Sequence, residues 1–122
     1  MNVLLVDDDP GIRLIAGFVL GSAGHQVRDA ATSVDADALL AESVPDLLLM
    51  DFMLGDEDGV AAAERLLEPF GADRPRLIFL TAAVRPEHTA RMMRAGAAGI
   101  VHKPFDPETF VATIDGILDG AE

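Results

Sequence analysis

Acidic side chains follow two short apolar runs of the sequence. Residues 2–6 are followed by Asp7 and Asp8, and residues 47–50 are followed by Asp51. A short uninterrupted apolar run is typical of a strand that is buried on both faces of a parallel sheet. Ligands of such sheets bind beyond the carboxyl ends of the strands, so these carboxylates stand where chemistry is expected. Considered alone, Asp51 could equally well begin a turn.

A hydroxyl and an ammonium group follow two further runs. Thr81 ends the run 76–81 and Ala82 follows it, and Lys103 follows the run 99–102. If these runs are parallel strands, their carboxyl ends meet at one edge, where three carboxylates would raise each other's pKa. A divalent cation relieves that repulsion, and Mg²⁺ prefers oxygen ligands. Taken singly, a solvated lysine, a strand-end hydroxyl and helix-capping acids remain the ordinary explanations.

The elements that must position these groups alternate along the chain. Strands are predicted at 2–6, 26–30, 45–51, 76–81 and 99–102. The first predicted helix runs from Pro10 to about Ala23, and the second has Ser33 as its N-cap and ends before Pro45. The third follows the loop 55–59 and ends at Pro69, and the fourth runs from Pro86 to Gly96. The fifth has Asp106 as its N-cap and Pro107 as its first residue. Such alternation predicts one α/β domain over residues 1–122, a three-layer sandwich of five parallel strands and five helices.

Composition limits the class of protein. Nine basic and 21 acidic residues give a net charge of −12, which argues against nucleic acid as a direct partner. Half of the residues are hydrophobic, so disorder is not expected, and the absence of cysteine excludes a disulfide framework. No apolar run reaches the ~18 residues of a membrane span, and the first residues lack the basic region of a signal peptide. We therefore expect a cytoplasmic protein without a membrane partner.

Taken in order, the motifs resemble the receiver domain of two-component response regulators, the CheY-like family with a flavodoxin-like fold. They are Val-Asp-Asp-Asp-Pro after the first strand, Pro-Asp-Leu-Leu-Leu-Met-Asp up to Asp51, Asp58-Gly59, Leu-Thr-Ala after the fourth strand, and Lys-Pro-Phe after the fifth. The resemblance covers the whole chain and implies the strand order 2-1-3-4-5.

The resemblance also implies a metal site and a nucleophile. Asp8 and Asp51 would bind Mg²⁺ directly, with Mn²⁺ as a substitute, Asp7 would bind it mostly through water, and the backbone carbonyl of Met53 would add a ligand. Asp51 would then attack a phosphoryl group from a sensor histidine kinase or a histidine phosphotransfer protein and become an acyl phosphate. The phosphorylated domain would switch the binding of an unknown output partner or form a homodimer.

Other residues would assist this chemistry. By the same resemblance, Lys103 neutralises charge on the phosphoryl oxygens, Thr81 and Ala82 stabilise the group and take part in the switch, and the Lys103–Pro104 peptide bond is cis. The domain would not be an enzyme in the usual sense, although self-phosphorylation from small donors and autodephosphorylation are expected of it.

Four positions depart from the family pattern. Ile100 replaces the usual aromatic residue three positions before the lysine, so an inward-turning ring cannot relay the signal. Gly55 replaces a common proline, which should loosen that loop. Met53 and Ala83 occupy positions that tune how water reaches the acyl phosphate, and neither side chain can orient water.

Two surfaces are candidates for partners. The helix after Pro10 has more apolar residues than one buried stripe needs, and Leu14 and Phe18 are left over for docking a helical partner. An oversized core stripe would explain them equally well. Arg91 and Arg94 lie on the predicted fourth helix, where an acidic partner or a second copy could meet them, although solvation is the usual explanation of such charges.

Three other functions compete with a phospho-acceptor. Phosphohydrolases that use an aspartyl phosphate place a second Asp two residues later, where this chain has Met53. A flavin-binding protein of similar topology is disfavoured because the sequence has no Trp, no Tyr and no Ser/Thr-rich loop after the first strand. A phosphorylation-independent, receiver-like interaction module is the remaining alternative, although the complete acidic pocket with Lys103 argues against it.

Overall fold

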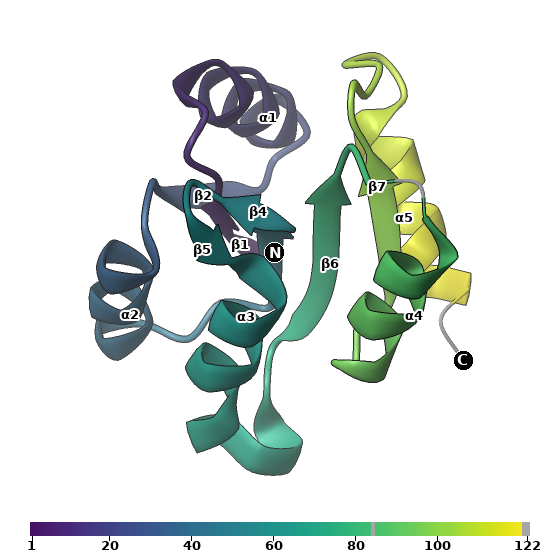
Figure 1. The fold of residues 1–122 in the computed structure, drawn as a ribbon. Helices are drawn as coiled ribbons and strands as arrows, with labels where there is room; N and C mark the ends of the chain where they lie inside the picture. Colours follow the sequence, from purple (N-terminus) through teal and green to yellow (C-terminus); the bar gives the residue numbers. More distant parts are fainter. Residues whose placement is uncertain (84, 121–122) are drawn as a thin grey trace.

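The computed structural model describes residues 1–83 and 85–120 and shows an α/β fold (Figure 1). The elements, in order, are β1 (Asn2–Val6), α1 (Pro10–Ser22), β2 (Gln26–Ala30), α2 (Ser33–Glu42), β3 (Leu47–Asp51), β4 (Met53–Leu54), β5 (Glu57–Asp58), α3 (Gly59–Leu67), a 3₁₀ helix (Glu68–Asp73), β6 (Arg76–Thr81), α4 (Pro86–Arg94), β7 (Gly99–His102) and α5 (Phe110–Gly120). Within the described residues, no helix is long and apolar enough to cross a membrane.

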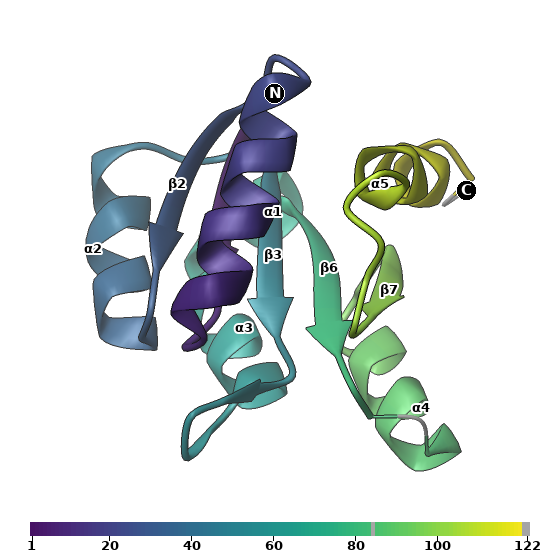
Figure 2. The ribbon, with the colours of Figure 1, turned by 90° about the horizontal axis from the view of Figure 1, so that it is seen from above.

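The main sheet has five strands in the order β2-β1-β3-β6-β7, and all neighbouring pairs are parallel. Counting these strands alone, this is the predicted order 2-1-3-4-5, and the predicted fold class is confirmed. Figure 2 shows the arrowheads of the strands directed toward one edge of the sheet. The groups that follow the strands are therefore brought to a common edge, as their positions in the sequence predict.

Helices cover both faces of the sheet and create two cores. Alternate residues of β3 point into different cores: Leu47 and Leu49 pack with residues of α1 and α5, whereas Leu48 and Met50 pack with residues of α2, α3 and α4. Every residue of β3 is buried. Burial on both faces explains why this strand is an unbroken apolar run rather than an alternating one.

Two predicted helix starts are wrong. Thr32, not Ser33, caps α2, because the Thr32 hydroxyl accepts a hydrogen bond from the backbone N–H of Asp35 at 3.1 Å. The Ser33 hydroxyl instead donates to Glu57 at 2.9 Å. Helix α5 begins at Phe110 and not near Asp106, whose carboxylate accepts from the N–H of Glu108 within a turn.

The loop predicted at 55–59 is partly a hairpin. Strands β4 and β5 pair antiparallel, with Met53 opposite Asp58 and Leu54 opposite Glu57. Gly55 in the connecting turn has φ +62°, in the left-handed region where glycine pays no steric penalty. After the hairpin, α3 ends at Leu67, before the predicted end at Pro69. The hairpin directly follows β3, so its geometry is coupled to that of Asp51.

Candidate functional site

Three carboxylates meet at the carboxyl edge of the sheet. Asp7 follows β1 and is fully buried, Asp51 ends β3 and is 6% exposed, and Asp8 is exposed. One oxygen from each of them lies within 4.8 Å of the other two. The parallel arrangement of β1 and β3 brings these groups together from positions more than 40 residues apart in the chain.

Asp7 and Asp8 do not cap the following helix. Asp9 is the N-cap of α1, and its carboxylate accepts hydrogen bonds from the N–H groups of Gly11 at 2.8 Å and Ile12 at 3.3 Å. One oxygen of Asp7 accepts from the N–H of Asp9 at 2.9 Å, which fixes the buried carboxylate. Helix capping therefore accounts for Asp9 but not for Asp7 and Asp8, whose carboxylates belong to the cluster with Asp51.

Lys103 reaches the cluster from the end of β7. Its ammonium lies 2.8 Å from Oδ2 of Asp7 and 3.2 Å from Oδ1 of Asp51. Within the described residues, Oδ2 of Asp7 is buried and accepts no well-formed hydrogen bond, so the ammonium is its electrostatic compensation. The Lys103–Pro104 peptide bond is cis. Lys103 is also the sole lysine of the sequence.

Thr81 completes the edge at the end of β6. It is 2% exposed, and its hydroxyl oxygen accepts a hydrogen bond from the N–H of Ala83 at 2.8 Å. Oδ1 of Asp51 accepts from the N–H of Met53 at 3.3 Å. The loops that follow β3 and β6 are therefore each bonded to the side chain that precedes them.

These groups line a cavity of about 500 Å³. Its walls are formed by Asp51, Phe52, Met53, Thr81, Ala82, Ala83, His88 and Lys103. His88 belongs to α4. The sequence did not identify it as a site residue, because the only pattern tested for the histidines was the spacing of metal ligands, which they do not have. A polar residue in the first turn of a helix that follows a strand end is the weak signal that marks such a position.

Burial and neighbouring charges perturb both ionisable partners. Burial, followed by the charge of Asp7, raises the pKa of Asp51 from 3.8 to about 7, although Lys103 opposes the rise. For Lys103, burial acts to lower the pKa, but its contacts with Asp7 and Asp51 together outweigh burial, so the pKa lies above 10.5. In the metal-free protein, ionising Asp51 is therefore unfavourable, whereas Lys103 stays charged.

The raised pKa of Asp51 makes the stability of the metal-free protein depend on pH. Between pH 4 and 7 the unfolded chain releases this proton while the folded chain retains it, so this carboxyl lowers the free energy of unfolding as pH rises. Asp51→Asn, which is neutral throughout, should be about as stable as the wild type near pH 4 and increasingly more stable toward pH 8. Thermal unfolding in chelator measures this difference.

A matched titration with Mg²⁺ provides the control. The ion should raise the melting temperature of the wild type at pH 8 more than that of Asp51→Asn, because only the wild type has the full set of repelling carboxylates. A stability difference between the two proteins that stays constant from pH 4 to 8 would contradict the assignment of the raised pKa to Asp51.

The cluster fits a divalent cation. All three groups offer hard oxygen donors, two of them are buried, and one buried oxygen has no well-formed hydrogen bond. Mg²⁺ binds through one or two carboxylates and keeps several waters, which suits a site with one exposed acid and an adjoining cavity.

Comparison with known proteins decides the family. The sequence profile described as "Response regulator receiver domain" matches residues 3–115. The chain is a response regulator receiver domain. This family places the domain in two-component signal transduction, and the phosphorylation-independent alternative is not favoured. Receiver domains of this kind are signalling modules rather than enzymes in the usual sense.

Similar proteins include transcriptional regulators. The receiver domain is 32% identical to the phosphate regulon transcriptional regulatory protein PhoB of Pseudomonas aeruginosa over 96% of this chain and 51% of that protein. It is 34% identical to the transcriptional regulatory protein PhoP of Escherichia coli, over 97% and 52%. The chain thus spans about half the length of these relatives. Among solved structures, chemotaxis protein CheY4 of Vibrio cholerae superposes with a TM-score of 0.87 at 28% identity, over 95% of this chain and 97% of that one.

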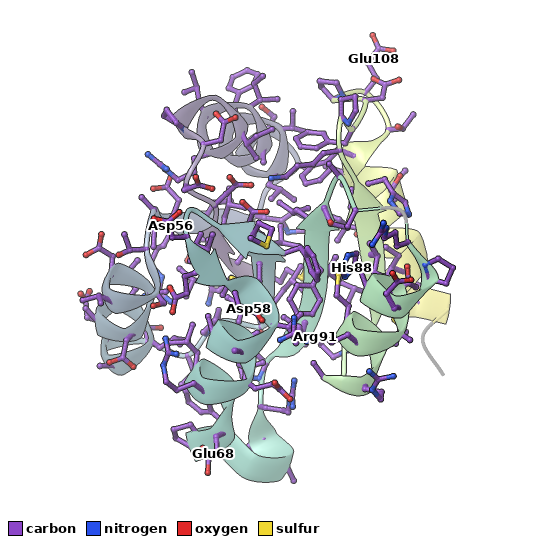
Figure 3. The ribbon with its side chains drawn as sticks, in the orientation of Figure 1. Asp56, Asp58, Glu68, His88, Arg91 and Glu108 are labelled. Atoms are coloured by element: carbon purple, nitrogen blue, oxygen red, sulfur yellow. The ribbon has the colours of Figure 1, made fainter. Side chains whose placement is uncertain are left out.

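Of the two candidate partner surfaces, the apolar one on α1 is exposed, whereas part of the basic one on α4 is used within the domain. Leu14 and Phe18 on α1 are each 73% exposed, so they lie outside the core. Arg91 forms an ion pair with Asp58, the N-cap of α3 (Figure 3). Arg94, at the end of α4, is exposed. Arg91 is therefore committed to a contact within the domain, which weakens its interpretation as a partner-binding residue.

Proposed function

We propose that Asp51 accepts a phosphoryl group from a sensor histidine kinase or a histidine phosphotransfer protein in a Mg²⁺-dependent reaction. The observation that carries this proposal is the convergence of three carboxylates within 4.8 Å, with the Lys103 ammonium 3.2 Å from Asp51. Phosphorylation then changes the binding of an output partner or favours a homodimer. Residues 1–122 form one receiver domain in this proposal, located in the cytoplasm.

The site residues have separate roles toward the metal ion. Asp8 and Asp51 would hold Mg²⁺, or Mn²⁺ in its place, with Asp7 acting through water and the Met53 backbone carbonyl as a further ligand. The ion supplies positive charge that compensates the carboxylates and the phosphoryl oxygens. Asp51 is well suited to nucleophilic attack because it stands at the tip of β3, where the cavity opens beside it.

In the transfer itself, a carboxylate oxygen of Asp51 forms a bond to phosphorus as the bond to the donor breaks. The leaving group departs with the electron pair and takes up a proton. Lys103 offsets charge on the phosphoryl oxygens, since its ammonium already lies within 3.2 Å of Asp51. Thr81, which also lines the cavity, donates its hydroxyl to the transferred group, and Ala82 follows it in the loop.

Phosphorylation by a small donor tests the proposal. The purified domain is incubated with acetyl phosphate, with and without Mg²⁺, and its intact mass is measured. We expect a mass gain of one phosphoryl group in Mg²⁺ and none in chelator, and a greatly reduced gain for Asp8→Asn. A folded, Mg²⁺-binding protein that no donor phosphorylates would contradict the proposal and favour a phosphorylation-independent interaction module.

The apolar face of α1 gives a prediction about the donor protein. Leu14→Ser combined with Phe18→Ser should slow phosphotransfer from the cognate kinase about tenfold or more, because two exposed anchors of the proposed docking surface are lost. Phosphorylation by acetyl phosphate and the melting temperature should be unchanged, since neither side chain lies in the core. Equal transfer rates from the kinase to variant and wild type would rule out this docking surface.

A further inference from the structure

The cavity beside Asp51 contains one polar side chain that the proposed transfer does not use. Once Asp51, Thr81 and Lys103 are set aside, the remaining lining residues are Phe52, Met53, Ala82, Ala83 and His88. Among these five, only the imidazole of His88 can donate or accept a hydrogen bond through its side chain. Apart from the groups that the proposed transfer uses, His88 is therefore the described lining residue whose side chain can hold a water molecule in this cavity.

One direct ring contact, and an ion pair made by a neighbouring residue of α4, fix the position of His88. Its ring packs against Phe52, the residue after Asp51, with the ring centroids 5.0 Å apart and the planes tilted by 57°. Three residues later on α4, Arg91 pairs with Asp58, whose carboxylate also accepts from the N–H of Val60 at 2.9 Å.

Residues three apart lie on the same face of a helix, so α4 is held against the 52–58 segment at two points (Figure 3). The imidazole is therefore held in a fixed position in the wall of the cavity, unlike a side chain on the open surface. It is half-buried, which leaves part of the ring open to the cavity.

We infer that His88 orients the water molecule that hydrolyses the acyl phosphate of Asp51. The inference rests on the proposed function and extends it to the lifetime of the phosphorylated state. The side chains of Met53 and Ala83, which line the same cavity, have no hydrogen-bonding group, so they cannot perform this task. A ring nitrogen of His88 accepts a hydrogen bond from the water and directs the water oxygen toward phosphorus.

The hydrolytic step balances without a further reactant. The water oxygen forms a bond to phosphorus while the bond between phosphorus and the Asp51 carboxylate oxygen breaks. Asp51 leaves with the electron pair as a carboxylate. Both protons of the water remain with the phosphate, which departs as dihydrogen phosphate. His88 is a positioning residue in this step and is not consumed.

Three substitutions at one position separate hydrogen bonding from packing. His88→Gln keeps a side-chain acceptor, His88→Phe keeps the ring packed against Phe52 without an acceptor, and His88→Ala removes both. Each protein is phosphorylated with acetyl phosphate and Mg²⁺, the donor is removed, and loss of the phosphoryl group is followed by intact mass. His25→Ala, near the start of β2, serves as the control for loss of a histidine elsewhere.

We expect His88→Ala and His88→Phe to hydrolyse about tenfold more slowly than the wild type, as the loss of one oriented hydrogen bond implies, and His88→Gln to recover part of the rate. The melting temperature of His88→Phe should stay close to that of the wild type, because the ring still packs against Phe52. The hydrolysis rate is measured after the donor has been removed, so it does not depend on how fast each protein was phosphorylated. A wild-type rate in His88→Phe would overturn the inference, because packing alone would then suffice. A wild-type domain that never becomes phosphorylated would overturn the proposed function and this inference with it, whereas equal lifetimes in all variants would overturn the inference alone.

Discussion

Gly59→Ala should lower the free energy of unfolding by about 3 kcal/mol or more. Gly59 is the first residue of α3, and its N–H donates to the carbonyl oxygen of Phe52 at 2.9 Å. A Cβ atom at this position would overlap the carbonyl oxygen of Asp51 and lie 2.7 Å from that of Phe52. Both obstacles are backbone atoms, of the proposed phospho-acceptor and of the residue after it, so neither can be relieved by a side-chain rotation.

Chemical denaturation and thermal unfolding measure this effect, with an expected drop in melting temperature of roughly 10 °C. Phosphorylation by acetyl phosphate should also slow, because relief of the clash displaces Asp51. The matched control is Gly116→Ala in α5, where a Cβ would meet no atom within 4 Å and should stabilise the helix by about 0.5–1 kcal/mol. A Gly59→Ala protein as stable as the wild type would show that α3 does not approach β3 as closely as described.

Lys103→Met should slow phosphorylation by a small donor about 100-fold. The substitution keeps the length of the side chain but removes the ammonium that lies 3.2 Å from Asp51. The variant should bind Mg²⁺ at least as tightly as the wild type, because the lost ammonium would repel a cation at the neighbouring metal site. The expected result is therefore a protein that binds the ion at least as tightly as the wild type but accepts phosphate poorly.

Arg76→Met is the matched control, since it removes one positive charge at the start of β6, at the opposite edge of the sheet. It should be phosphorylated at the wild-type rate. Because Lys103 is the sole lysine, lysine labelled with ¹³C at Cε provides one NMR signal that reports the pKa of this ammonium directly. We expect a value above 10.5 in the metal-free wild type and a lower one in Asp51→Asn. Equal phosphorylation rates in Lys103→Met and the wild type would remove Lys103 from the mechanism.

The residues that meet at the carboxyl edge of the sheet could be predicted, because each strand end is marked by a short stretch of the sequence. The apolar run that ends in Asp51 and the residues that end β1, β6 and β7 each identify a strand end, and parallel pairing then fixes their common edge. Even β2, a short strand with little periodicity, has its predicted bounds of Gln26–Ala30. Strand order came from family resemblance, since local patterns carry no information about which strands are neighbours.

Features that depend on tertiary contacts were not predicted. The β4–β5 hairpin has two residues per strand, too few for a periodic pattern. The start of α5 is shifted because the rings of Phe105 and Phe110 stack with centroids 4.2 Å apart, which leaves the residues between them in a turn. The contacts of His88 with Phe52 and of Arg91 with Asp58 join segments more than 30 residues apart, so spacing along the chain could not reveal them.

The proposed reaction places the phosphoryl group on Asp51 itself, and locating that group in the protein tests this assignment. The domain is phosphorylated with acetyl phosphate and Mg²⁺, the acyl phosphate is trapped by borohydride reduction, and the modified residue is located by peptide mass spectrometry, with Asp51→Asn treated in parallel. We expect that Asp51 alone is reduced in the wild type and that no residue is reduced in the variant. Reduction at Asp7 or Asp8, or an equal phosphoryl content in Asp51→Asn, would contradict it.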